Sequence, residues 1–197
     1  SLSAAVIILY SLFFQPDPEV VKKNLAKQNN GVSNTDTPSL EKNENFIKLS
    51  REEALKENAR IKFENDNIIG SISLKGATID DLTFKDYNVE LNGDESVKLL
   101  NPRNVDDGYV IESGFVTNNK NIDIPNASTV WKISGNNILK VNNPIKLSWS
   151  NSQGITFEKH ISLDDQFLFT VKEKIINKSN KSYNFYSYGQ IIRNELP

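Results

Sequence analysis

The stretch IGSISLKGATIDDLTFKDY, residues 69–87, decides the fold class of this chain. Ile72 and Leu74 alternate with serine and lysine residues, and this period of two is typical of a half-buried β-strand. Gly76 supplies the backbone freedom that a sharp reversal requires. Leu82 and Phe84 then begin a second alternating segment. The stretch therefore predicts a strand, a tight turn and a second strand.

Asp80 and Asp81 form the only cluster of acidic residues in this stretch, and the pattern places them at the turn. Aspartate is favoured in turns because its side chain forms hydrogen bonds with the local backbone. We therefore interpret the pair as solvated turn residues without a catalytic role.

Similar short segments recur from Arg60 to the end of the chain. Turn signals such as Asn-Pro, Asp-Gly and Asn-Ser-Gln-Gly separate them, and the last of these predicts a hairpin between residues 145–149 and 155–161. The turn signal at 177–180 separates the strand that begins at 167–171 from the segment 183–192. No amphipathic helix lies between the strands, so we predict a mainly β fold, an antiparallel β-sandwich.

A short helical turn is predicted just before the first strand. Ser50 is followed three residues later by Glu53, which is the pattern of a capping box. The helical turn is expected to end near Asn58, so the folded domain is predicted to cover residues 50–197.

Residues 2–14, LSAAVIILYSLFF, are apolar and uncharged. A membrane-spanning helix needs roughly 20 apolar residues, so the segment is too short to span a membrane alone. A truncated transmembrane helix, the core of a signal peptide and a buried helix are the three alternatives. The sequence Phe13-Phe14-Gln15-Pro16 lacks the small residues of a cleavage site, and aromatic residues suit a membrane interface. We favour the first of these alternatives and expect residues 1–14 to be the C-terminal half of a signal-anchor helix.

Residues 15–49 are rich in Asn, Lys, Thr, Ser and Pro, with too few apolar residues to bury a face. This composition predicts a flexible, disordered tether. Its first part, residues 15–21, contains Asp17 and Glu19 but no Lys or Arg, which favours the translocated side of the membrane. The sequence contains no methionine, so we expect it to be a segment of a longer protein.

The composition excludes several classes of function. A formal net charge of −2 gives no basic face for nucleic acid. The absence of cysteine excludes disulfides and thiolate metal sites. His160 is the only histidine, and on an alternating strand we interpret it as a surface or cross-strand residue. We therefore expect no catalytic residue, no metal, no cofactor and no enzymatic activity.

Aromatic residues crowd the second half of the chain. In the run 183–188, Tyr183 and Phe185 share one face of the expected strand, and Tyr186 and Tyr188 share the other. If the first face is core, the second carries an aromatic pair that is able to line a groove. Packing within the core or across strands is the preferred interpretation, because aromatic residues on strands mainly bury area.

Several of these segments resemble the YidC family of bacterial membrane protein insertases, in its alphaproteobacterial form. The resemblance begins with the 69–87 stretch and covers about residues 50–197. Its further motifs occur in the family's order: SREEAL at 50–55, VKLLNP at 97–102, PIKLSW at 144–149, GITFEKHI at 154–161 and YGQI at 188–191.

The resemblance implies a periplasmic domain of β-supersandwich type, truncated at its C-terminal end, that follows a transmembrane helix and a tether. It also implies an inner-membrane protein, with residues after about 15 in the periplasm, whose partners are nascent inner-membrane proteins and the Sec translocon. Arg193 lies in the wrong domain to be the functional arginine of the family's membrane groove. Two alternatives stay open: a sugar-binding or mutarotase-like enzyme on the same fold, and a membrane-anchored β-sandwich binding module.

Overall fold

The computed structural model describes residues 48–194. The half-helix expected at 1–14, nearly all of the tether at 15–49 and residues 195–197 lie outside the described residues. No helix within residues 48–194 combines the length and the apolar composition that crossing a membrane requires.

The described part opens with helix α3 (Arg51–Lys56). The Ser50 side chain accepts a hydrogen bond from the Glu53 backbone N–H at 3.3 Å, and the Ser50 N–H donates to Glu53 Oε2 at 3.0 Å. The predicted capping box is therefore confirmed, and the helix ends at Lys56, close to the expected position.

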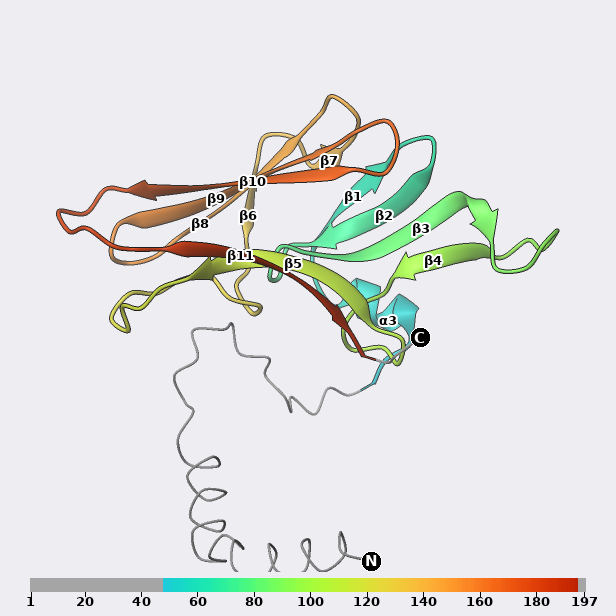
Figure 1. The fold of residues 1–197 in the computed structure, drawn as a ribbon, viewed down its shortest axis with the longest axis horizontal. Coiled ribbons are helices and arrows are strands. Elements are labelled where there is room, and N and C mark those ends of the chain that lie inside the picture. The colour runs from blue at the N-terminus through green and yellow to red at the C-terminus, as the bar shows by residue number, and fades with distance from the viewer. Residues whose placement is uncertain (1–47, 195–197) are drawn as a thin grey trace, which may run out of the picture. The chain divides into compact units, whose positions relative to one another are not determined.

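The rest of the described chain forms two β-sheets (Figure 1). The seven-stranded sheet has the order β11-β5-β3-β2-β1-β7, with β4 also paired to β3. Its strands are β1 (Arg60–Glu64), β2 (Ile68–Ser73), β3 (Thr78–Asn88), β4 (Ser96–Leu100), β5 (Tyr109–Val116), β7 (Ile138–Leu139) and β11 (Tyr186–Arg193). The four-stranded sheet has the order β10-β9-β8-β6. Its strands are β6 (Lys132–Ser134), β8 (Ile145–Ser150), β9 (Ile155–Leu163) and β10 (Phe169–Asn177).

The mainly β, antiparallel prediction is confirmed, with one departure. Strand β7 pairs with β1 in parallel, through Lys62 opposite Ile138 and Phe63 opposite Leu139. All other strand pairs are antiparallel within residues 48–194. The connection from β1 to β7 spans much of the chain, and local sequence patterns carry no information about such a pairing.

The stretch 69–87 forms the predicted strand, turn and strand. Gly76 has φ +73°, a conformation that favours glycine, and lies between β2 and β3. Ser71 and Ser73 are buried, however, so the prediction that β2 is half-buried is wrong at these two positions. Arg60 covers Ser71 and donates to its Oγ at 2.7 Å, whereas Ile69 on the same face of β2 is 44% exposed.

The apolar core lies between the two sheets and contains residues of both. Its buried members include Ile61, Phe63, Ile68, Ile72, Leu82, Leu100, Phe115, Trp131, Leu147, Ile155, Phe157 and Ile161. Leu74 and Phe84 pack against this cluster. The apolar positions of the two predicted strands, at 72, 74, 82 and 84, therefore all lie in the core or against it.

The turn at 177–180 connects the two sheets. Strand β10 pairs with β9, whereas β11 pairs with β5 in the other sheet (Figure 1). The two consecutive strands therefore do not form a hairpin. The predicted hairpin between β8 and β9 is confirmed, with Trp149 opposite Phe157 and Gly154 at φ +83°.

Candidate functional site

The structure places a lysine inside the sandwich. Lys159 lies on β9 between Phe157 and Ile161, and all three side chains point to the same face because side chains alternate along a strand. Only 1% of Lys159 is exposed. In the sequence, Lys159 is one residue of the family motif GITFEKHI at 154–161. Its position in the inward register of β9 was the signal that would have identified it as a buried charge.

Polar and aromatic groups of both sheets surround the Lys159 ammonium. Nζ donates hydrogen bonds to the Ser113 backbone carbonyl and to Ser113 Oγ, the latter at 3.0 Å. Glu173 Oε1 lies 3.7 Å away, and the Trp131 ring centroid lies at 5.3 Å. Burial lowers the pKa of Lys159 to about 8, while the charges of Glu173 and Glu112 oppose this shift.

Two neighbouring groups belong to the same polar centre. Burial raises the pKa of Glu173, although the Lys159 charge opposes that shift. Burial also raises the pKa of the Tyr188 hydroxyl, and the nearby charges of Glu112 and Glu173 act in the same direction. Glu112 is held by Arg103 at 2.6 Å and by the Gln190 amide at 3.1 Å.

A small hollow adjoins this centre. It is lined by Gly76, Glu112, Ser113, Gly114, Pro125, Asn126, Ala127, Trp131 and Tyr188. Its volume of about 10 Å³ accommodates roughly one water molecule. Trp131 Nε1 is buried and has no acceptor among residues 48–194. The space suits a single water-sized group and is far too small for a sugar ring.

The Asp80-Asp81 pair lies inside β3 and not at the turn, so the prediction that these residues are solvated is wrong. Asp80 is only 7% exposed and forms an ion pair with Arg60. Asp81 forms an ion pair with Arg51 of α3 and accepts a hydrogen bond from Ser71 Oγ at 2.6 Å. Burial raises the pKa of Asp80, although Arg60 opposes that shift. Both arginines are distant in sequence, so the local turn pattern did not indicate them.

His160 lies on the outer face of β9, as the alternation predicted. Its Nε2 lies 3.3 Å from Glu158 Oε2, and Glu158 is also paired with Lys146 at 2.6 Å. Within residues 48–194 no group of three or more His, Cys, Asp or Glu side chains converges as a metal site.

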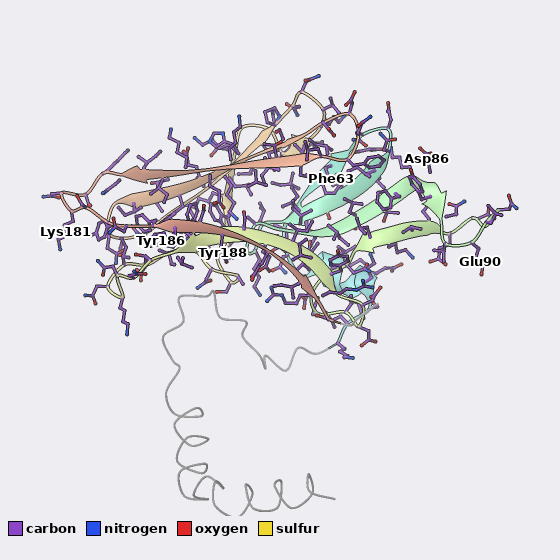
Figure 2. All side chains as sticks on the ribbon, in the orientation of Figure 1. Phe63, Asp86, Glu90, Lys181, Tyr186 and Tyr188 are labelled. Atoms are coloured by element: carbon purple, nitrogen blue, oxygen red, sulfur yellow. The ribbon has the colours of Figure 1, made fainter. Side chains whose placement is uncertain are left out.

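The aromatic run 183–188 divides between core and surface. Tyr183 and Phe185 pack against the core, where the Phe185 and Phe157 ring centroids lie 5.4 Å apart. Tyr188 lines the small hollow, whereas Tyr186 is exposed; Figure 2 labels both on β11. The inward face predicted for Tyr183 and Phe185 is confirmed, but the two other tyrosines do not line one groove together. Arg193 lies over the Tyr109 ring at 5.3 Å.

Comparison with known proteins gives the family context. The family model described as the YidC periplasmic domain matches residues 60–197. The membrane protein insertase YidC of Pelagibacter ubique is 78% identical over 197 residues, which is 100% of this chain and 35% of the relative. The proteins of that name from Mesorhizobium japonicum and Rickettsia felis are 37% and 34% identical, over 75% and 98% of this chain and 24% and 35% of the relatives. The chain thus spans about a third, or less, of the length of these relatives.

Proposed function

Because the chain belongs to the YidC family and matches its periplasmic domain, we propose that it is the accessory periplasmic part of a membrane protein insertase. The insertase would insert and help fold inner-membrane proteins, alone or with the Sec translocon. The observation that carries this proposal is the family match over residues 60–197, which coincides with the two-sheet domain.

The proposed layout has three parts. Residues 1–14 form the C-terminal half of a transmembrane helix, residues 15–49 tether the domain, and residues 50–197 fold in the periplasm. The apolar segment LSAAVIILYSLFF supports the anchor, and the composition of residues 15–49 supports the tether. The helix start at Arg51, directly after the Ser50 cap, supports the domain boundary.

The domain acts in this proposal through contacts with proteins. The buried polar centre around Lys159 has room for only about one water molecule, so it offers no space for a larger ligand. The sugar-processing alternative finds no support in the family comparisons, and a mutarotase assay with several aldoses provides its direct test. Robust turnover that is lost in an Asp or Glu variant would contradict the proposal.

The proposal is tested in cells depleted of their own insertase. They receive an insertase that carries this sequence, either intact or with residues 50–197 replaced by a Gly/Ser linker. Integration of a reporter inner-membrane protein is followed by protease accessibility, and Sec components are sought by co-purification. We expect the replacement to reduce both readouts. An insertase with Gly189→Ala, a change in open space on β11, is the matched control. Unchanged integration and unchanged co-purification after replacement would reject the accessory role.

A further inference from the structure

Exposed and half-buried aromatic residues from two distant parts of the chain meet at one surface. The Phe84 and Tyr87 ring centroids of β3 lie 5.4 Å apart. Phe167, in the turn between β9 and β10, lies 5.8 Å from Phe84. Tyr87, Phe167 and the neighbouring Leu168 are exposed, Leu168 to 63%. The fold therefore assembles an apolar surface that no single segment carries.

The β3–β4 hairpin continues this surface outward. Val89 is exposed, and Leu91 is 95% exposed at the hairpin tip. Figure 1 shows this hairpin extending beyond the neighbouring strands, and Figure 2 labels Glu90 at its outer end. We call the six residues Phe84, Tyr87, Val89, Leu91, Phe167 and Leu168 the hairpin patch.

The hairpin tip is ordered by its own hydrogen bonds. The Val89 N–H donates to the Glu95 carbonyl at 2.8 Å, and the Gly93 N–H donates to the Glu90 carbonyl at 3.0 Å. The Asn88 side-chain amide donates to the Gly93 carbonyl. A loop that is already ordered loses little conformational entropy when a partner binds. The exposed leucine is thus presented on a preorganised support.

Acidic side chains surround the hairpin patch. Asp86, Glu90, Asp94 and Asp165 have no ion-pair partner within the described part of the chain. Two nearby lysines are already paired, Lys85 with Glu64 at 2.6 Å and Lys98 with Glu95 at 2.9 Å. The surface around the exposed apolar residues therefore carries negative charge. Figure 2 labels Asp86 and Glu90 on this hairpin.

We infer that the hairpin patch binds a protein segment with apolar side chains flanked by lysine or arginine. Complementary charge steers such a segment to the surface, and the exposed aromatic and leucine side chains provide the contact area. Anionic lipid headgroups would be repelled by the acidic side chains. A second copy bound through the same patch would place acid against acid. This inference rests on the proposed function, since it assigns the contact role of the module to a surface.

The test uses the full chain in buffer with an uncharged detergent and three short fluorescent peptides. The first has a Leu/Phe core flanked by lysines, the second has the same core flanked by glutamates, and the third has a serine core flanked by lysines. Fluorescence anisotropy should detect binding of the first peptide only, with detergent alone as the blank. The pair Tyr87→Ser and Leu91→Ser should weaken that binding at least roughly tenfold.

Charge reversal gives a gain of binding that misfolding cannot imitate. Glu90→Lys combined with Asp94→Lys should weaken binding of the lysine-flanked peptide and create binding of the glutamate-flanked peptide. Tyr186→Ser combined with Ile191→Ser is the matched control, because these residues are also exposed but lie on β11. The control should bind the first peptide like the unchanged chain.

Several results would overturn the inference. The first is equal binding of the lysine-flanked and glutamate-flanked peptides. The second is unchanged peptide binding after the hairpin substitutions. The third is a β11 control that loses as much peptide binding as the hairpin variants. The chain could instead bind to vesicles that contain anionic lipid. If the hairpin substitutions abolish that binding, the surface is a membrane-binding surface. If sedimentation shows a dimer and the same substitutions dissociate it, the hairpin patch binds a second copy of the chain. Peptide binding needs no insertion activity, so a failed insertion assay and a failed peptide assay are separate results.

Discussion

Lys159 and Glu173 face each other directly across β9 and β10, and Lys159 Nζ lies 3.7 Å from Glu173 Oε1. This distance makes an ion pair but is too long for a hydrogen bond. The ammonium instead donates to Ser113 of β5, so a single side chain joins the two sheets. Removing two charges from water costs free energy that their attraction only partly returns. The pair therefore makes the sandwich sensitive to the loss of either partner.

The first prediction is a non-additive effect on the free energy of unfolding. Lys159→Met or Glu173→Gln should each destabilise the fold, Lys159→Met by about 3 kcal/mol, because each leaves a buried polar group without its partner. The double substitution should cost at least about 1 kcal/mol less than the sum of the single costs. Urea denaturation provides the measurement. Lys172→Met, on the exposed face of β10, is the matched control and should change stability by less than about 0.5 kcal/mol. Strictly additive costs would show that the pair is not coupled.

The second prediction concerns pH. The folded-state pKa of Lys159 is lowered from 10.5 to about 8, so between these values the unfolded chain binds more protons than the folded chain. Stability should therefore rise with pH in this window. The gain should be about 1.5 kcal/mol from pH 8 to 9.5, relative to the Lys159→Met/Glu173→Gln double variant. Higher pH is avoided because the raised pKa of Tyr188 introduces the opposite slope above its ordinary value of 10.0. Parallel pH profiles for the two proteins would contradict the burial of a charged Lys159.

The third prediction concerns Gly70 in β2. A Cβ atom at this position would lie 2.0 Å from the Asp81 backbone oxygen and 2.6 Å from the Phe63 ring. Gly70→Ala should destabilise the domain by about 1–3 kcal/mol, since the neighbouring strand must move. Gly189→Ala is the control, because the added Cβ would lie 4.0 Å from the Glu112 carbonyl oxygen, the nearest atom apart from its two chain neighbours. Thermal unfolding compares the Gly70→Ala and Gly189→Ala variants. Equal melting temperatures would refute the close approach of Gly70 to the Asp81 backbone.

The fourth prediction concerns Arg60 and Asp80. Both side chains are about nine-tenths buried and form an ion pair across β1 and β3. Arg60→Met should cost about 3 kcal/mol because it leaves the Asp80 carboxylate buried without its partner. Adding Asp80→Asn should recover part of that loss. Denaturant unfolding of the unchanged protein and of the single and double variants measures these changes in the free energy of unfolding. An Arg60→Met variant with unchanged stability would show that the pair contributes nothing to it. Lys62→Met, on the exposed face of β1, is the control.

The residue pattern predicted local features well. The alternating segments expected from Arg60 onward begin with β1 at that residue, and the Ser50–Glu53 spacing placed the start of α3. The pattern predicted the environment of Asp80 wrongly, because the turn preference of aspartate carries no information about its partner Arg60. The pattern also did not identify Lys159 as buried, although the alternation of β9 places it on the same face as Phe157 and Ile161. Charged residues were misjudged because their burial depends on partners that are distant in sequence.

The residue pattern alone established the β class, the turns at Gly76 and Gly154, and the family resemblance, since strand period and turn chemistry depend on neighbouring residues. The folded arrangement was needed to show that β10 and β11 belong to different sheets, that Glu173 faces Lys159, and that Phe167 meets Phe84. These contacts join segments far apart in the chain. Their free energy arises from burial and charge pairing that exist only once both sheets have formed.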